Sequence, residues 1–83
     1  MANIQKKYVG LLGGSFDPAH KGHLGISKIA IKKLKLKKVY WVITRKNPFK
    51  RNTFYSLNKR IKYAKKISRL QKKIQAIHLE NIV

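Results

Sequence analysis

The sequence predicts an α/β fold in which parallel strands alternate with helices. Two short, mostly apolar runs, Tyr8–Leu12 and Val39–Thr44, indicate buried strands, and the five consecutive apolar residues of the second indicate a strand covered on both faces. Each run is followed by a polar loop and then by a segment with helical period. A third run, Ile74–Leu79, completes the order strand, helix, strand, helix, strand. This order predicts half of a doubly wound parallel sheet with strand order 3-2-1.

Turn and cap signals place the boundaries of these elements. Gly13-Gly14 is expected to end the first strand in a sharp turn, and Asp17-Pro18 marks a loop. The first helix is expected from Gly22, and Ser56 is a suitable N-cap for the second. The residues predicted to face inward are Leu24, Ser27, Ala30, Ile31 and Leu34 in the first helix and Leu57, Ile61, Ala64 and Ile67 in the second. Trp41 is expected in the core.

Length and charge limit the classes of function. The 83 residues make one domain at most, 1–83, and the absence of cysteine excludes disulfides and thiolate metal sites. The apolar runs are too short for a membrane span or a signal peptide, so we expect a cytoplasmic protein with no membrane partner. Lys and Arg number 21 against two acidic residues, a net charge of +19 that attracts nucleic acid without specificity. The Lys- and Ile-rich composition is also typical of AT-rich genomes, so charge alone identifies no function.

The segment 13–23 has the composition of a phosphate-binding loop. It lies between a predicted strand and the start of a helix, where main-chain N–H groups and the helix dipole favour an anion. Gly13 and Gly14 allow the backbone to approach a phosphate closely, Ser15 offers a hydroxyl, and Gly22 leaves the helix start open.

Two histidines in this segment are the candidate catalytic residues. His20 and His23 are three residues apart, so their imidazoles can converge on one point across a helical turn. A metal pair is the alternative, but there is no Cys and Asp17 is better used in the turn, so the pattern favours phosphate. His78, alone in a strand, is expected to have a structural or surface role.

The same residues resemble a known signature. Gly-Gly-Ser-Phe-Asp-Pro-Ala-His-Lys-Gly-His at 13–23 resembles the first motif of the HxGH-type, or cytidylyltransferase-like, nucleotidyltransferases, and specifically of bacterial nicotinate-nucleotide adenylyltransferases. Val39–Val42 followed by Asn47–Lys50 looks like the second strand and loop of some members, and Leu79-Glu80 resembles the acidic end of their third strand. The resemblance implies a Rossmann-like fold. Pantetheine-phosphate adenylyltransferases, which usually differ at the double glycine and at His20, are the alternative.

The resemblance implies a reaction and a set of roles. The reaction is attack of the nicotinate mononucleotide phosphate on the α-phosphorus of ATP, with Mg²⁺, giving deamido-NAD and pyrophosphate. His20 and His23 would bind the ATP phosphates and stabilise the transition state. The predicted nucleotide-binding residues are Gly13, Gly14, Ser15, Phe16, Gly22 and Lys50.

The resemblance covers only the N-terminal part of a family member. Later segments of the family are absent, including a Ser-rich turn that grips ATP phosphates, so we expect a truncated or inactive fragment. The first strand would have one uncovered edge, which predicts possible self-association. The alternatives are a basic module that binds nucleotides or nucleic acid without catalysis, and a decayed gene product.

Overall fold

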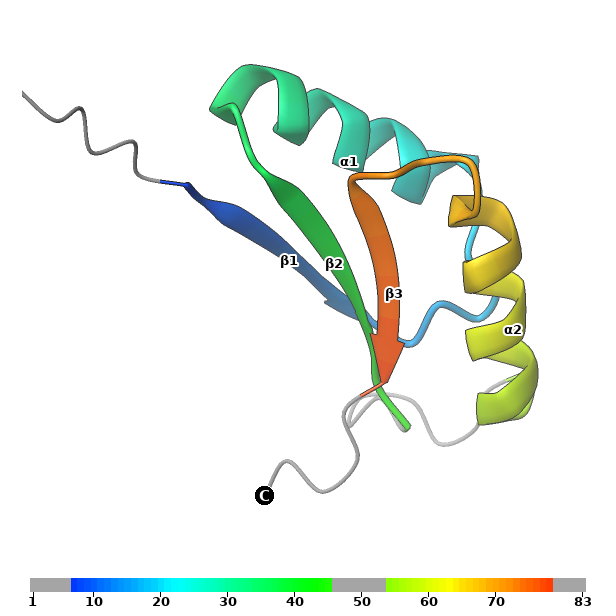
Figure 1. The fold of residues 1–83 in the computed structure, drawn as a ribbon. Helices are drawn as coiled ribbons and strands as arrows, with labels where there is room; N and C mark the ends of the chain where they lie inside the picture. Colours follow the sequence, from blue (N-terminus) through cyan, green and yellow to red (C-terminus); the bar gives the residue numbers. More distant parts are fainter. Residues whose placement is uncertain (1–6, 46–53, 79–83) are drawn as a thin grey trace, which may run out of the picture.

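A computed structural model describes residues 7–45 and 54–78 (Figure 1). The elements are β1 (Val9–Gly14), α1 (Lys21–Leu34), β2 (Lys38–Ile43), α2 (Leu57–Ser68) and β3 (Ile74–His78). All strand pairs are parallel and the order is β1-β2-β3. The Rossmann-like α/β fold and the predicted strand order are therefore confirmed.

The register aligns the carboxyl ends of the three strands. Gly14 pairs with Ile43, and Ile43 pairs with His78. The loop after β1 and the segment after β2 consequently start at the same edge of the sheet, which is where ligands bind in open α/β sheets.

The core lies between the helices and one face of the sheet. In Figure 1 both helices lie on the same side of the strands. On that face Trp41 and Ile43 are fully buried and pack with Ala64 of α2, which confirms Trp41 as a core residue. On the opposite face Leu11 of β1 is 72% exposed, and Tyr40 and Val42 of β2 are only half-buried. Within the described residues, therefore, the strands are covered on one face, and the expectation of cover on both faces is wrong.

Three local expectations also need correction. β1 continues through Gly13 and Gly14 instead of ending at Leu12, because both glycines pair with β2. Leu34 is 65% exposed, since α1 ends there and Lys35 closes the helix in a left-handed conformation. Arg60, which is not among the residues of α2 predicted to face inward, is 2% exposed.

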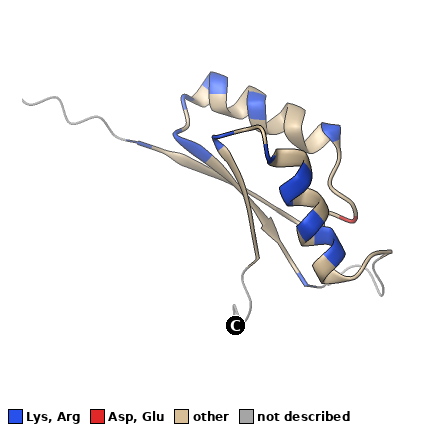
Figure 2. Ribbon diagram, turned by 45° about the vertical axis from the view of Figure 1, so that its right-hand side comes forward, with Lys and Arg blue, Asp and Glu red and all other residues tan. Residues whose placement is uncertain are grey.

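The surface is strongly basic. Figure 2 shows Lys and Arg along α1 and α2 and in the connecting segments. In the described part of the chain β1 pairs with β2 alone, so its outer edge carries no strand. Self-association through this edge stays a prediction, as does the treatment of 1–83 as one domain. No helix among the described residues is long and apolar enough to cross a membrane.

Candidate functional site

The loop between β1 and α1 is held by two buried residues. Phe16 is 3% exposed and has a φ of 48°, so the sharp change of direction occurs here and not at the glycines before it. Left-handed backbone costs a residue with a Cβ about 1–2 kcal/mol. Ala19 is buried as well, and the Asp17–Pro18 peptide between the two anchors is cis.

The Phe16 ring links the loop to the core and to one histidine. Its centroid lies 5.3 Å from that of Trp41 in a stacked arrangement and 4.5 Å from that of His23. Aromatic pairs at these separations contribute roughly 0.5–1.5 kcal/mol beyond burial. Phe16 thus supports the His23 imidazole from the side of the core.

His20 and His23 are brought together as the sequence predicts. His20 is the N-cap of α1, and the two ring centroids lie 4.1 Å apart. Nδ1 of His20 accepts the main-chain N–H of Gly22 at 3.0 Å, and Nδ1 of His23 accepts the main-chain N–H of His20 at 3.0 Å. Because each Nδ1 is an acceptor, the proton of each neutral ring is on Nε2. Both histidines are therefore hydrogen-bond donors at Nε2.

Gly22 makes room for the His20 ring. A Cβ on Gly22 would lie 2.7 Å from Cε1 and 2.8 Å from Nδ1 of His20, closer than real Cβ contacts. No φ in the left-handed region is involved, since none of the described glycines has one. The absence of a side chain at this position is what allows the imidazole to fold back over the helix start.

The His23 imidazole favours its neutral form. Its partial burial lowers the pKa below the ordinary value of 6.5, and the neighbouring His20 ring lowers this pKa further. At neutral pH His23 therefore contributes an N–H donor and not a full positive charge.

Asp17 connects this loop to the segment that precedes α2. Its carboxylate accepts the main-chain N–H of Phe54 at 2.5 Å and that of Tyr55 at 2.8 Å. A role of Asp17 within its own turn predicts amide donors close in sequence, whereas the actual donors are 37 and 38 residues away. The carboxylate thus fixes the position of one loop relative to another.

Arg60 is the residue of this region that the sequence analysis missed. Its guanidinium donates to the carbonyl oxygens of Ser15, Thr44, Arg45 and Tyr55. The helical spacing contains a signal for it: position 60 lies three after Leu57 and four before Ala64, on the stripe that faces inward.

The other predicted site residues lie in β1, just after it, or outside the described residues. Gly13 and Gly14 lie in β1, Ser15 follows it with its carbonyl bonded to Arg60, and Lys50 lies outside the described residues. The segments 47–50 and 79–80, which carry part of the family resemblance, also lie outside them. Within residues 7–45 and 54–78 there is no cluster of three or more His, Asp or Glu side chains that could hold a metal ion.

Three parallel strands joined by helices, with a polar loop at their carboxyl ends, define a Rossmann-like α/β protein. Open sheets of this kind bind ligands at that edge. The family model described as cytidylyltransferase-like matches residues 11–82. The chain belongs to the cytidylyltransferase-like family.

Curated relatives of this chain share a name that is more specific than the family description. The chain is 58% identical over 65 residues to a probable nicotinate-nucleotide adenylyltransferase of Pelagibacter ubique, an alignment covering 78% of this chain and 36% of that protein. It is 51% identical over 59 residues to a protein of the same name from Ruegeria sp., covering 71% and 31%. A third, from Bradyrhizobium sp. (strain ORS 278), is 40% identical over 76 residues, covering 90% and 39%. The matched part of this chain spans about a third of these relatives.

Proposed function

We propose that this chain forms the ATP-phosphate-binding part of a nicotinate-nucleotide adenylyltransferase. The observation that carries the proposal is the pair of imidazoles at the start of α1, both fixed at Nδ1 and both able to donate from Nε2. The names of the curated relatives, probable nicotinate-nucleotide adenylyltransferases, support nicotinate mononucleotide as the acceptor, and we propose ATP as the donor of the adenylyl group. Catalytic roles for His20 and His23 are part of the proposal.

In this reaction a phosphate oxygen of nicotinate mononucleotide attacks the α-phosphorus of ATP. The P–O bond to the β-phosphate breaks, and the products are deamido-NAD and pyrophosphate. Such transfers depend on positioning and on stabilising the negative charge of the phosphate oxygens, and they need no covalent nucleophile. The two Nε2–H groups supply hydrogen-bond donors for that charge, and the N-terminus of α1 adds its dipole.

The remaining predicted residues have supporting roles in this proposal. Gly22 keeps the His20 ring in place, and the Phe16 ring backs His23. The backbone of Gly13, Gly14 and Ser15 borders the nucleotide, and Lys50 is proposed to contact an anionic group of a substrate.

Mg²⁺ belongs to the substrate in this scheme. Asp17, the one acidic residue in the described part of the chain, already accepts two main-chain N–H groups, and no cluster of ligands stands beside it. The described residues therefore do not form a protein-ligated Mg²⁺ site. Mg²⁺ prefers to retain water and bind phosphate oxygens, so we propose that it is bound by the triphosphate.

The test combines binding and turnover. Trp41 is the single tryptophan and stacks on Phe16, so its fluorescence reports Mg-ATP binding near the loop. We expect the wild type to bind Mg-ATP and His23→Ala to bind it weakly. Pyrophosphate release is then measured with nicotinate mononucleotide, with nicotinamide mononucleotide and phosphopantetheine as comparators. Binding that is absent, or unchanged in His23→Ala, would contradict the proposal.

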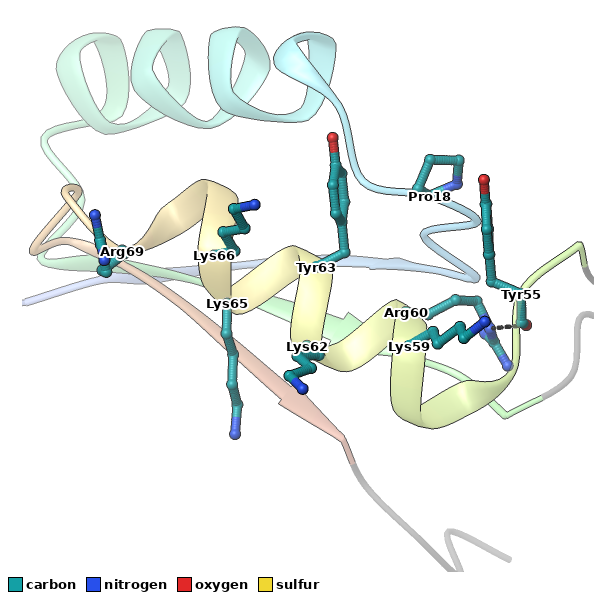
Figure 3. Close-up of a pocket in the computed structure, with 9 residues that line it drawn as sticks. All are labelled: Pro18, Tyr55, Lys59, Arg60, Lys62, Tyr63, Lys65, Lys66 and Arg69. Atoms are coloured by element: carbon teal, nitrogen blue, oxygen red, sulfur yellow. Dashed lines mark hydrogen bonds between the residues drawn. The ribbon is translucent and has the colours of Figure 1, made fainter.

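One observation favours a second candidate, nonspecific binding of single-stranded nucleic acid. A groove of about 870 Å³ runs along α2 (Figure 3). It is lined by Pro18, Tyr55, Lys59, Arg60, Lys62, Tyr63, Lys65, Lys66 and Arg69. The lining contains no acidic residue, and the half-exposed rings of Tyr55 and Tyr63 offer faces on which bases can stack.

Salt and mutation distinguish this candidate from the phosphate site. Binding of a labelled uridine oligonucleotide should weaken steeply with salt, should be unchanged in His20→Ala and should weaken in Tyr63→Ala. Salt-independent binding, or equal binding by Tyr63→Ala, would exclude the groove as its site.

A further inference from the structure

Arg60 carries a buried positive charge directly beside the candidate site. It belongs to the first turn of α2 and is 2% exposed, although most other cations of this helix face solvent. Burying a guanidinium is costly unless its donors are satisfied, so the position of Arg60 needs a physical reason.

The guanidinium joins three segments that end at the site. Nη1 donates to the carbonyl oxygen of Ser15 at 2.8 Å and to that of Thr44 at 2.7 Å. Nη2 donates to the carbonyl of Arg45 at 2.7 Å, and Nε to that of Tyr55 at 3.1 Å. The acceptors thus come from the turn after β1, from the chain after β2 and from the segment before α2. One side chain sets the relative positions of all three.

The geometry of these bonds suits arginine and not lysine. A guanidinium has a rigid planar fork of five N–H donors, whereas an ammonium has three donors at one point. A lysine at this position would keep the charge but could not reach four carbonyls spread around a plane.

The charge of Arg60 is not cancelled by a carboxylate. All four acceptors are backbone carbonyls, and Asp17, the one acid among the described residues, accepts instead from the amides of Phe54 and Tyr55. Carbonyl dipoles solvate a cation without neutralising it. A positive charge in contact with the turn between β1 and His20 therefore favours the binding of an anion at that turn.

We propose that Arg60 is a positioning residue for the triphosphate of ATP. It holds the turn after β1 against the end of β2 and places a fixed positive charge at the carbonyl of Ser15, in the loop that precedes the imidazole pair. This proposal rests on the proposed function, because it takes ATP as the ligand.

The test compares variants of the 83-residue chain that differ in charge and in geometry. Arg60→Lys retains the charge, Arg60→Gln removes it, and Lys28→Gln is a charge-matched control on the exposed side of α1. Mg-ATP affinity is measured at a temperature where urea titrations show each variant to be folded. We expect affinity to fall on the order of tenfold in Arg60→Lys, further in Arg60→Gln, and less than twofold in the control.

A measurement on the wild type covers the case in which the variants do not fold. The Nε–H resonance of Arg60 should shift when Mg-ATP is added, since Nη1 of the same guanidinium donates to the carbonyl of Ser15, whose backbone borders the nucleotide in the proposed function. Folded Arg60→Lys that binds like the wild type, or an Nε–H resonance that does not move at saturation, would overturn the role of Arg60 alone. Failure of the wild type to bind Mg-ATP would overturn the proposed function together with this inference.

Discussion

Trp41 and Ser27 are joined by a buried hydrogen bond that connects the centre of the sheet to the helix of the candidate site. Nε1 of Trp41 donates to Oγ of Ser27 at 2.8 Å, and the same hydroxyl donates to the carbonyl oxygen of His23 at 2.7 Å. The hydroxyl is thus used as acceptor and as donor, and Ser27 is 1% exposed. The backbone of His23 is in this way tied to a core residue of β2.

Ser27→Ala should destabilise the fold. It leaves the buried Trp41 N–H without an acceptor, which costs about 1–3 kcal/mol in the free energy of unfolding. Urea unfolding followed by circular dichroism measures the loss. Ser68→Ala is the matched control, because the buried Ser68 hydroxyl bonds only to the carbonyl of Ala64 one turn earlier in its own helix. Equal losses in the free energy of unfolding of the two variants would show that the hydrogen bond from Trp41 to Ser27 stabilises the fold no more than the Ser68 bond does.

Gly22→Ala should weaken Mg-ATP binding while leaving the chain folded. The new Cβ displaces the His20 ring, so its Nδ1 loses the Gly22 N–H and its Nε2 no longer faces the same point. We expect a loss of affinity on the order of tenfold, measured by the Trp41 fluorescence titration.

Gly25→Ala provides the control within the same helix. A Cβ there meets nothing within 4 Å, and alanine is favoured over glycine in helices by about 0.5–1 kcal/mol. This variant should therefore be more stable than the wild type and bind Mg-ATP equally well. If both variants bind alike, the position of the His20 ring does not matter for binding.

The sequence predicts the elements well because their signals are local. Apolar runs, helical period and the Ser56 N-cap all depend on near neighbours, and Ser56 does accept the N–H of Lys59. The convergence of His20 and His23 follows from a spacing of three residues. Such features can be predicted without knowing which residues distant in sequence are in contact.

The parts that the sequence could not supply depend on distant contacts. The partners of Asp17 and Arg60 lie up to 45 residues away. Gly13 and Gly14 have the composition of a turn, yet the register with β2 keeps them in the strand, and Phe16 takes the left-handed conformation instead. At these positions tertiary contacts override the local conformational preference of the residues.

Asp17→Asn should release the segment before α2 from the β1–α1 loop. The amide has one acceptor oxygen in place of two and loses the negative charge, so the N–H groups of Phe54 and Tyr55 exchange faster with solvent. We expect a loss of about 1–3 kcal/mol in the free energy of unfolding, and hydrogen exchange by NMR localises it. Ser56→Ala removes the α2 cap while leaving the carboxylate bonds, so it should not speed exchange at Phe54. Protection of both amides in Asp17→Asn would contradict their assignment to this carboxylate.

The lowered pKa of His23 predicts how stability and binding depend on pH. In the folded chain the ring titrates below its unfolded value of about 6.5, because it is partly buried and lies beside His20. Between the folded and the unfolded pKa the unfolded chain binds more protons, so the free energy of unfolding falls as pH decreases through this window. Phosphate oxygens beside His23 raise its pKa again, so Mg-ATP binding should take up protons in the same window and tighten as pH falls. NMR titration of the His23 ring measures its pKa in the folded chain. Calorimetry in two buffers of different ionisation enthalpy measures the uptake of protons when Mg-ATP binds. His23→Asn keeps an acceptor for the His20 N–H but does not titrate, so the difference between the two proteins isolates His23 from the protons of ATP itself. Equal proton uptake by the wild type and His23→Asn would show that His23 does not face the phosphates.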